Sequence, residues 1–430
     1  MRKQLCVIGL GYIGLPTAAV FADNGFDVTG VDVNETLVNQ LNDGQLKTRE
    51  KGLDMLLARL AEEGKITASA SPVEADIYII AVPTPHNADH TANLDYVSQA
   101  AKSILPVLRK GNTVIVESTI PPRTTRDVVA PIIEMSGLTA GDDVFLAHCP
   151  ERVLPGKILT ELYENNRIVG GINRFSASKV ADVYRTFVMG KVMETSAENA
   201  ETAKLMENTY RNVNIALANE LSKLSEGLKI NPLEVISLAN EHPRVNIHQP
   251  GPGVGGHCIP VDPYFIMEKD PANTPLITEA MAVNESMPGF VVEQVKKMVS
   301  IENGKVAVFG LAYKGETDDI RKSPALKVVE QLQNEAYKVS VYDPYVREAQ
   351  ICYELSSFED TLEDADMLLI LTDHQKFKNL NWSQVNRLMK TAVVLDTKDC
   401  VENDTGSADY YSFRNLYELS DYQSSVKLGK

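Results

Sequence analysis

Three glycines near the amino terminus constrain the fold more than any other feature of the sequence. Gly9, Gly11 and Gly14 form the pattern G-x-G-x-x-G, directly after the apolar run QLCVIGL and before a stretch with helical periodicity. The next apolar run, FDVTGVDV, carries Asp32, 18 residues after Gly14. A glycine-rich turn between a strand and a helix, with an acidic residue ending the second strand, is typical of dinucleotide binding in a doubly wound sheet.

Each part of this pattern has its own expected role. Gly9 makes the tight turn, Gly11 lets the backbone approach the pyrophosphate, and Gly14 lets the helix pack closely on the strand. Because the carboxylate of Asp32 accepts hydrogen bonds from the ribose and repels a 2′-phosphate, we expect NAD rather than NADP. The alternative is a glycine-rich turn in some other α/β protein. The expected cofactor contacts here are Gly9, Gly11, Tyr12, Ile13, Gly14 and Asp32.

Apolar strands alternate with helical stretches in two blocks of the chain, which predicts parallel, doubly wound sheets. Further strands expected in the first block are DIYIIAVPTP, NTVIVEST, DVFLAHCPE, RIVGG and KVMET. Those expected in the second block are KVAVFGLAYK, KVSVYDPY, DMLLILTDH and TAVVLDTK. The last stretch, 401–430, is polar and weakly patterned, and no element is predicted there.

A long helix is expected between the two blocks, because residues 196–230 lack proline and their apolar residues recur at helical spacing. Shorter helices are predicted to about residue 245, and helical structure again over 275–300. The predicted fold class is α/β, with two Rossmann-like doubly wound domains joined by this long central helix and a helical domain. The predicted domains are 1–195, 196–300 and 301–430.

Charge and composition exclude several classes of partner. The net charge of −16 argues against nucleic acid and anionic membranes, so an anionic substrate would need a local basic pocket. No apolar run reaches membrane-spanning length, and the short apolar run near the start is interrupted by glycine and lacks a cleavage site. Five cysteines, odd in number and scattered, are typical of a reducing compartment. We therefore expect a cytoplasmic protein without membrane or nucleic-acid partners.

The stretch GPGVGGHCIPVDPY, residues 251–264, places Cys258 in a loop rich in glycine and proline. Glycines permit close approach of a ligand, and prolines stiffen a loop. On an NAD enzyme, a thiolate can attack an aldehyde, and hydride loss from the adduct then leaves a thioester that water hydrolyses to an acid. The alternatives are a buried structural cysteine and a metal ligand beside His257. No standard zinc spacing or C-x-x-C is present, so no metal is expected.

Seven segments together resemble the nucleotide-sugar 6-dehydrogenases, the UDP-glucose/UDP-mannuronate dehydrogenase family, over nearly the whole chain. They are VIGLGYIGLP, AVPTP, ESTIPPRTT, HCPERVLPGK, AKLMENTYRNVNIALANE, HPRVNIHQPGPGVGGHCIPVDPYF and FGLAYKGETDDIRKSPA. Three parts of them, HCPERVLPG, HPRVN and PGPGVGGHC, are most similar to the branch that acts on UDP-N-acetylmannosamine. The UDP-glucose branch has serine before the cysteine and Lys-Asp after it. Here His257 and Val261-Asp262 stand there, which argues against UDP-glucose.

The resemblance implies a four-electron oxidation of the sugar C6 hydroxyl to a carboxylate, with two NAD and one water. It implies that Cys258 is the nucleophile of the second oxidation and that Lys204 and Asn208 stabilise oxyanions. Their i, i+4 spacing agrees, because it puts both on one helix face. It further implies proton transfer by Asp262 and by a water associated with Thr119, and activation of water by Glu151. The alternatives are a solvated charge for Lys204 and an ion pair with Arg152 for Glu151.

The resemblance also implies binding residues and a homodimer. Arg244 would reach a substrate in the neighbouring subunit, Lys314 would contact UDP, and Arg321 would contact NAD. Implied cofactor contacts beyond the glycine pattern are Pro83, Thr84, Thr119 and Arg321. Implied substrate contacts are Glu151, Arg152, Lys204, Asn208, Arg244, Gly255 and Lys314.

Several functional alternatives stay open at this point. One is the same chemistry on UDP-N-acetylglucosamine or another UDP-hexose. Another is a two-electron dehydrogenase of the hydroxy-acid or phosphogluconate type, which lacks the nucleophilic cysteine. A third is a non-catalytic nucleotide-sugar sensor. The resemblance favours the oxidation of UDP-N-acetylmannosamine for capsule or surface-polysaccharide synthesis.

Overall fold

The computed structural model describes residues 3–48, 50–154, 156–299 and 304–419. The chain divides into two compact units. The first comprises Met1–Glu207 with Tyr264–Asp270, and the second comprises Asn208–Pro263 with Pro271–Lys430. The predicted domain limits at 195/196 and 300/301 remain a prediction.

An eight-stranded sheet forms the first unit, in the order β3-β2-β1-β4-β5-β6-β7-β8. The strands from β3 to β6 are all parallel, in the 3-2-1-4-5-6 order of a doubly wound dinucleotide-binding sheet. The sequence analysis predicted these strands except β3. Their bounds are β1 (Gln4–Ile8), β2 (Asp27–Val31), β3 (Ile66–Ser69), β4 (Ile77–Ile80), β5 (Thr113–Val116), β6 (Phe145–His148), β7 (Arg167–Gly171) and β8 (Val192–Ser196).

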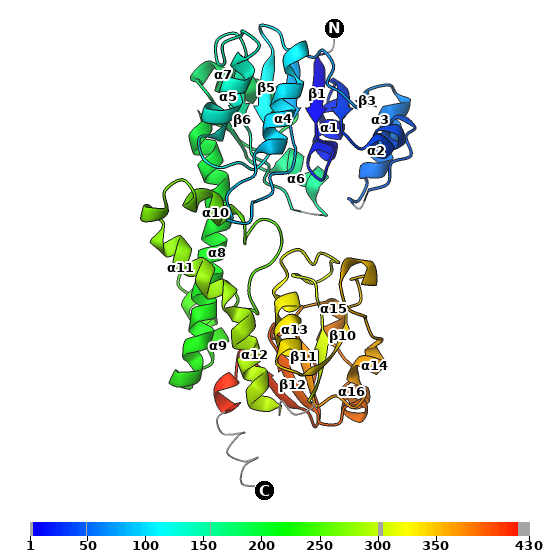
Figure 1. Cartoon of the computed structure of the whole chain (residues 1–430), viewed down its shortest axis with the longest axis vertical. Coiled ribbons are helices and arrows are strands. Elements are labelled where there is room, and N and C mark those ends of the chain that lie inside the picture. The colour runs from blue at the N-terminus through cyan, green and yellow to red at the C-terminus, as the bar shows by residue number, and fades with distance from the viewer. Residues whose placement is uncertain (1–2, 49, 155, 300–303, 420–430) are drawn as a thin grey trace. The chain divides into compact units, whose positions relative to one another are not determined.

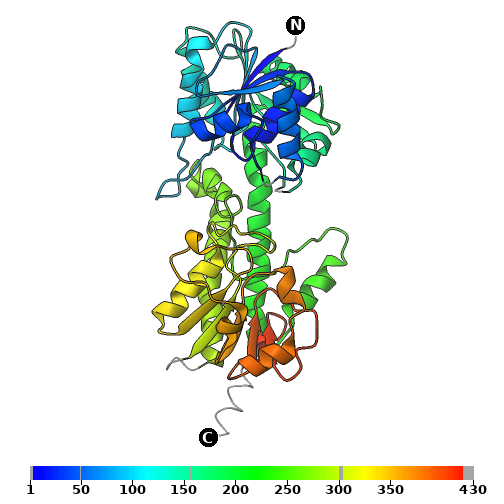
Figure 2. The same ribbon diagram turned by 90° about the vertical axis from the view of Figure 1, so that its right-hand side faces the viewer.

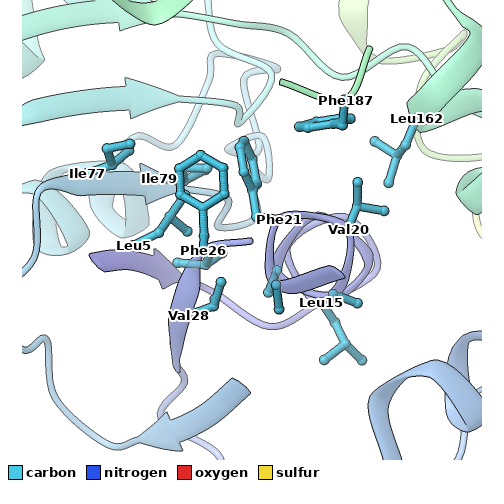
Figure 3. Close-up of a cluster of buried hydrophobic side chains, with 14 of the residues drawn as sticks. Leu5, Leu15, Val20, Phe21, Phe26, Val28, Ile77, Ile79, Leu162 and Phe187 are labelled. Atoms are coloured by element: carbon cyan, nitrogen blue, oxygen red, sulfur yellow. The ribbon is translucent and has the colours of Figure 1, made fainter. Parts of the chain in front are cut away.

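Helices cover both faces of this sheet, as a doubly wound fold requires (Figure 1). On one face Phe21 of α1 meets Phe26 and Phe187 at ring-centroid distances of 5.1 and 5.0 Å (Figure 3). On the other, α4 and α5 pack on strand residues such as Tyr78 and Val114. The helices are α1 (Gly14–Asp23), α2 (Glu35–Asn42), α3 (Leu53–Glu62), α4 (Asp95–Ser103), α5 (Ala130–Glu134, continuing a π-helical turn at Thr125–Val129), α6 (Ile158–Glu164) and α7 (Arg174–Tyr184).

One strand of this sheet departs from the predicted parallel arrangement. β7 runs antiparallel to β6, with Ala147 opposite Gly171 and His148 opposite Gly170. In the described part of the connection between the two strands, the one helix is the seven-residue α6, which does not return the chain to the amino end of the sheet. The chain therefore turns back along the edge it has just reached, and α7 then leads into β8, which is parallel to β7.

A five-stranded parallel sheet in the order β10-β9-β11-β12-β13 forms the centre of the second unit. One face packs on α12 and α13, and the other packs on α14, α15 and α16. The sequence analysis missed β13, a short edge strand in the stretch where no element was expected. The strands are β9 (Lys305–Phe309), β10 (Lys338–Tyr342), β11 (Met367–Ile370), β12 (Val393–Asp396) and β13 (Asp409–Ser412). The helices are α13 (Pro324–Asn334), α14 (Phe358–Leu362), α15 (Gln375–Lys378) and α16 (Trp382–Leu388).

The predicted long helix is confirmed as α8, Ala197–Leu228, a single unbroken helix of 32 residues (Figure 2). The expected helices beyond it are α9 (Pro232–Asn240), α11 (Pro275–Glu285) and α12 (Met287–Met298). The short helix α10 (Asp262–Met267) was not predicted, and it begins inside the stretch expected to be a loop. These elements confirm the predicted fold class, two α/β parts joined by a long helix and a helical segment. None of the helices in the described ranges is both long and apolar enough to cross a membrane.

Candidate functional site

The glycine pattern forms the turn between β1 and α1, and two of its glycines leave no room for a side chain. A Cβ on Gly9, whose φ is +93°, would lie 2.6 Å from the carbonyl oxygen of Ala81. A Cβ on Gly14 would lie 1.9 Å from the carbonyl oxygen of Gly9. Gly11 is exposed and has open space around it, so its backbone is free to approach a ligand. The three glycines therefore have the properties expected of them: a tight turn at Gly9, an open backbone at Gly11 and close helix packing at Gly14.

Asp32 stands directly after β2 and supports this turn. Its Oδ2 accepts from the backbone N–H of Leu10 at 2.9 Å, and its Oδ1 accepts from that of Asn34 at 2.9 Å. α1 begins with no side-chain cap at Ile13, so no side chain of the described residues occupies the positive end of this helix, which attracts an anion. These features fit NAD: a helix start without a side-chain cap, a glycine turn that a ligand can approach closely and a carboxylate at the end of the second strand.

Two further loops leave the carboxyl ends of neighbouring strands, after β4 and after β5. Pro83 and Thr84 belong to the first, and Thr119 belongs to the second. Ser118 joins the loops, because its Oγ donates to the backbone oxygen of Val82 at 2.7 Å. The predicted cofactor residues Pro83, Thr84 and Thr119 therefore lie on adjacent loops at the edge where this fold binds dinucleotides.

Glu201 of α8 holds the loop that carries Thr119. Its buried carboxylate accepts from the backbone N–H of Arg123 at 2.6 Å and of Thr125 at 2.7 Å. Arg123 has a φ of +72°, so the carboxylate secures a strained turn. Burial raises the pKa of Glu201 to about 7, although the bonds from Thr125 and Arg123 act in the opposite direction. Sequence reasoning did not single out Glu201.

Glu151 is almost fully buried, and its ion-pair partner is Arg167 rather than Arg152. Arg167 Nη1 lies 2.8 Å from Glu151 Oε2, and the backbone N–H of Arg152 donates to Oε1 at 2.6 Å. The side chain of Arg152 pairs with Glu207 at 2.6 Å and donates to the backbone oxygen of Asn166. The alternative that paired Glu151 with the Arg152 side chain is therefore wrong about the partner.

Lys204 and Asn208 both belong to α8, one helical turn apart, as predicted. Lys204 is half-buried in the first unit. Asn208 is buried in the second unit, where its Nδ2 donates to Asp262 Oδ2 at 2.6 Å. The structure thus brings together two residues, Asn208 and Asp262, that the sequence analysis assigned to the same chemistry from separate segments.

The loop of Cys258 passes close against the second α/β part, and its glycines make this approach possible. A Cβ on Gly255 would lie 2.4 Å from the Cβ of Tyr313, and one on Gly256, at φ +88°, would lie 3.0 Å from the Tyr313 ring. The N–H of Gly256 donates to the backbone oxygen of Arg321 at 2.8 Å. The glycines before the cysteine therefore seat the loop on Tyr313 and Arg321.

Buried asparagines hold both ends of this loop. Asn219 of α8 accepts from the N–H of Gly251 at 2.9 Å, and Asn212 donates to the backbone oxygen of Ile259 at 3.2 Å. Asn284 of α11 bridges them, accepting from Asn219 and donating to Asn212. After the cysteine, the N–H groups of residues 261 and 262 donate to the backbone oxygen of Cys258 at 3.0 and 2.9 Å. Sequence reasoning missed this asparagine bracket, because its members are far apart in the chain.

Arg244 lies in an exposed loop after α9. Its Nη2 lies 3.4 Å from Nε2 of His242. The loop is tied back to α8 by Asn214, which donates to the oxygen of Asn246 and accepts from the N–H of His248, both at 2.8 Å. An arginine at the surface of an anchored loop can serve a neighbouring molecule.

Lys314 and Arg321 flank the loop that follows β9. Lys314 is exposed, and within the described ranges no carboxylate forms an ion pair with it. Arg321 pairs with Asp319, with Nη2 2.6 Å from Oδ2. The N–H of Glu316 donates to Nδ1 of buried His374 at 3.0 Å, and His374 Nε2 lies 3.3 Å from Asp343 Oδ2. The loop thus presents Lys314 from a rigid base.

The second α/β part contains a turn like the glycine turn of the first, but the carboxylate that supports it, Asp343, is occupied by more hydrogen bonds than Asp32. Gly310 has a φ of +91° against +93° for Gly9, and Leu311 N–H donates to Asp343 Oδ2 at 2.7 Å as Leu10 donates to Asp32. Asp343 is buried and also accepts from residues 312, 345 and 346 and from His374. Since these donors occupy it, Asp343 is not available to a ribose as Asp32 is.

Among the described residues, no group of three or more His, Cys, Asp or Glu side chains is arranged to hold a metal ion. The predicted site residues instead form two groups, one in each unit. The first contains the glycine pattern, Asp32, Pro83, Thr84, Thr119, Glu151, Arg152 and Lys204. The second contains Asn208, Arg244, Gly255, Cys258, Asp262, Lys314 and Arg321.

Comparison with known proteins assigns the family. Residues 3–188, 198–286 and 307–403 match the NAD binding, central and UDP binding domains of the UDP-glucose/GDP-mannose dehydrogenase family. The chain is 48% identical to a UDP-N-acetyl-D-mannosamine dehydrogenase of Methanocaldococcus jannaschii, over 97% of each protein. The chain belongs to the UDP-glucose/GDP-mannose dehydrogenase family. This membership confirms the resemblance seen in the sequence.

Solved structures agree with this assignment. A UDP-N-acetyl-mannosamine dehydrogenase from S. aureus is 50% identical, with a TM-score of 0.88 over 97% of this chain and 100% of that one. A UDP-D-ManNAc dehydrogenase from Pyrococcus horikoshii is 40% identical, with a TM-score of 0.88 over 96% and 100%. As a member of the UDP-glucose/GDP-mannose dehydrogenase family, the chain is an NAD-dependent UDP-sugar dehydrogenase, and NAD is its confirmed cofactor.

The UDP binding domain of this family member holds a cation that sequence reasoning missed. Lys398 is the second residue after β12, and it lines a cavity of about 340 Å³ together with Leu233, Gln249, Pro250, Thr397, Asp399 and Phe413. Its position just beyond the carboxyl end of a parallel strand is the signal that could have found it. The cavity also reaches Pro250, at the start of the Cys258 loop.

Proposed function

We propose that this dehydrogenase oxidises the C6 hydroxyl of UDP-N-acetyl-D-mannosamine to the carboxylate of UDP-N-acetyl-D-mannosaminuronate, in two oxidations that use two NAD and one water. The observation that carries this proposal is the set of relatives bearing the name UDP-N-acetyl-D-mannosamine dehydrogenase, 41–48% identical over most of their length. The same chemistry on UDP-N-acetylglucosamine is the nearest alternative. The sensor alternative receives no support, because these relatives are dehydrogenases.

In the first oxidation, this chain's residues would stabilise charge and move a proton. NAD, when bound, accepts one hydride in each oxidation. The C6 hydroxyl proton passes to Asp262, or to a water near Thr119, as hydride leaves C6. Lys204 and Asn208 stabilise the negative charge that develops on the oxygen. The 2.6 Å bond from Asn208 to Asp262 supports this pairing, since it fixes the amide beside the proton acceptor.

In the second oxidation, Cys258 would form a bond to the aldehyde carbon. The thiolate adds to the carbonyl carbon and the oxygen takes a proton, which gives a thiohemiacetal. This adduct then loses a hydride from carbon and the proton from its hydroxyl group, which leaves a thioester. Water then attacks the thioester, Glu151 accepts its proton, and the C–S bond breaks to release the acid and the thiolate. The ion pair with Arg167 supports this role for Glu151, because it holds the carboxylate in one orientation.

Substrate binding would use cations in an otherwise acidic chain. Lys314, exposed on a rigid loop, and Lys398, at the cavity beside Pro250, are suited to a diphosphate. Arg152 and Gly255 complete the proposed substrate contacts within this chain. Arg321, which shares its loop with Lys314, is the proposed contact to NAD.

We propose that the enzyme is a homodimer in which Arg244 reaches the partner's substrate. Four large apolar side chains, Tyr210, Leu217, Leu224 and Leu228, are 53–62% exposed along α8. Their spacing of seven, seven and four residues puts them on one face of the helix. An apolar stripe of this length on a helix is typical of an interface with a second copy. We also propose a cytoplasmic location and a role in capsule or surface-polysaccharide synthesis.

The test is the number of NADH formed per sugar, with UDP-N-acetylmannosamine, UDP-N-acetylglucosamine and UDP-glucose compared side by side. Two NADH per UDP-N-acetylmannosamine, with little from the others, is the expected result. Two NADH from a different sugar would keep the mechanism and overturn the substrate. One NADH per sugar would remove Cys258 from its proposed role.

A further inference from the structure

A buried polar cluster lies behind Glu151 in the first unit, and the chemistry described so far does not use most of it. Glu117 is 2% exposed, directly after β5. Arg167 is 4% exposed, and Tyr184 is fully buried. Two carboxylates and one guanidinium within a protein interior call for an explanation, because burying charge without full pairing is unfavourable.

The antiparallel pairing of β6 and β7 brings Arg167 to Glu151. His148 lies opposite Gly170, and the same register continued by three residues sets Glu151 opposite Arg167. The resulting contact is the 2.8 Å ion pair between Arg167 Nη1 and Glu151 Oε2. Arg167 therefore holds Glu151 as a cross-strand partner on the extension of the sheet.

Tyr184, the last residue of α7, connects Glu117 to this ion pair. Its hydroxyl donates to Glu117 Oε1 at 2.6 Å. Its ring lies beneath the guanidinium of Arg167, whose central carbon is 5.0 Å from the ring centroid. On the other side, Thr17 of α1 donates to Glu117 Oε2 at 3.2 Å. A chain of contacts thus runs from the helix of the glycine pattern through Glu117, Tyr184 and Arg167 to Glu151.

We propose that Glu117 is a positioning residue for Glu151, acting through Tyr184 and Arg167, and that its charge controls how strongly Arg167 holds Glu151. This inference rests on the proposed role of Glu151 in hydrolysing the thioester. While Glu117 carries a proton, the guanidinium of Arg167 has Glu151 as its charged partner in the cluster and holds that carboxylate firmly. When Glu117 loses that proton, its negative charge attracts the same guanidinium and loosens the contact of Arg167 with Glu151, whose carboxylate can then turn toward the attacking water.

The groups that face Glu117 come from four elements. They are Thr17 of α1, Tyr184 of α7, Arg167 of β7, and Glu151 and Cys149 after β6. Burial raises the pKa of Glu117 to about 7, with Glu151 acting in the same direction and with Arg167, Tyr184 and Thr17 acting against it. Glu117 can therefore change charge in the range where a cytosolic enzyme works.

The test follows the hydrolytic step across pH in single turnover, by trapping the acyl-Cys258 enzyme and measuring its decay by mass. In the unmodified enzyme, we expect decay to accelerate as pH rises through about 7. In Glu117→Gln, which keeps the shape but cannot ionise, we expect a flat profile and a rate about tenfold lower at the alkaline end, a part of the roughly 10²–10⁴-fold that a positioned general base contributes. A profile for Glu117→Gln that matches the unmodified enzyme would overturn the proposal.

Two further variants keep the test decisive. Tyr184→Phe keeps the ring under Arg167 but removes the hydrogen bond from the Tyr184 hydroxyl, which lowers the pKa of Glu117. The acceleration of hydrolysis should therefore occur at a higher pH in this variant. Glu201→Gln is the matched control, because Glu201 is also buried with a pKa raised to about 7, yet its carboxylate bonds to the 123–125 loop and not to the cluster around Arg167. Whatever its effect on rate, Glu201→Gln should keep the acceleration of hydrolysis as pH rises through about 7. Loss of this acceleration in Glu201→Gln would show that Glu201, and not Glu117, causes the pH dependence.

Glu151→Gln separates failure of this inference from failure of the proposed function. If Glu151→Gln releases the acid at the rate of the unmodified enzyme, Glu151 is not the base and the proposed function is wrong at that step. If Glu151→Gln accumulates the thioester while Glu117→Gln keeps the unmodified pH profile, only the role of Glu117 is wrong. Melting temperatures of all variants identify any that fail to fold.

Discussion

Asn208 donates from Nδ2 to Oδ2 of Asp262 at 2.6 Å, and both side chains are buried. The bond joins the middle of α8 to the first residue of α10, four residues after Cys258. Hydrogen bonds to a carboxylate are about twice as strong as neutral ones. This contact therefore fixes the position of the segment after Cys258 relative to the long helix α8. It also holds the amide in one orientation, with its oxygen directed away from Asp262.

Replacing Asn208 with alanine should impair the chemistry more than the binding. We expect kcat to fall by about 10²-fold, the usual effect of losing one oxyanion donor, with a smaller change in KM for the sugar. The control is Asn199→Ala, an exposed asparagine on the same helix, for which kcat should not change. Steady-state kinetics with the UDP-sugar decide the outcome. Equal effects of the two substitutions would show that Asn208 serves only the helix.

Cys258→Ala and Cys258→Ser should both abolish uronate formation, by at least about 10³-fold, because neither side chain forms the thioester. The measurement is the acid product, quantified by mass, alongside NADH. Cys352 is exposed and far in sequence from the loop, so Cys352→Ser serves as the control and should keep full activity. Full activity in either Cys258 variant would remove the thiol from the mechanism.

Gly14→Ala should weaken NAD binding and destabilise the fold together. The added Cβ would lie 1.9 Å from the carbonyl oxygen of Gly9, and such overpacking typically lowers the free energy of unfolding by about 1–3 kcal/mol. Gly227→Ala is the matched control, because nothing lies within 4 Å of a Cβ at this position in α8. It should raise stability by about 0.5–1 kcal/mol, as expected for a helix interior. Melting curves and NAD titration test both variants, and unchanged NAD affinity in Gly14→Ala would contradict the assignment.

The pKa of Glu117 predicts a specific pH dependence of stability. Burial raises this pKa from the ordinary value of 4.5 to about 7, so the folded state binds a proton that the unfolded state has already released. Stability from this group is therefore fully present below the unfolded value and is lost as pH rises toward the folded value. Glu117→Gln removes the titration, so its melting temperature relative to the unmodified protein should rise between about pH 5 and about pH 8. A difference that stays constant across this range would show that Glu117 keeps one charge state throughout.

The apolar stripe on α8 predicts the oligomeric state. Leu217→Lys places a charge in the middle of the stripe, so we expect the dimer to dissociate and the molar mass from light scattering to halve. Leu276→Lys is the control, since Leu276 on α11 is 68% exposed and lies outside the stripe. A dimer that persists in Leu217→Lys would place the interface elsewhere.

Features encoded within short stretches were predictable from the chain alone. The glycine pattern, Asp32 and α8 follow from local spacing, because a tight turn, a strand end and a helix are each decided by neighbouring residues. The resemblance to a nucleotide-sugar dehydrogenase likewise depends on contiguous motifs, and family membership confirms it. The short edge strand β13 was missed, since four residues at a sheet edge carry too little pattern to stand out.

Relations between distant segments were decided only by the tertiary structure. The ion pair of Glu151 with Arg167 depends on β7 running antiparallel to β6, and a parallel strand would have carried Arg167 to the opposite end of the sheet. The hydrogen bonds among the asparagines that hold the Cys258 loop depend in the same way on α8 and α11 lying side by side. Local sequence determines which elements form and which groups they carry. Which groups then meet depends on strand direction and register, and these are set by packing of the whole chain.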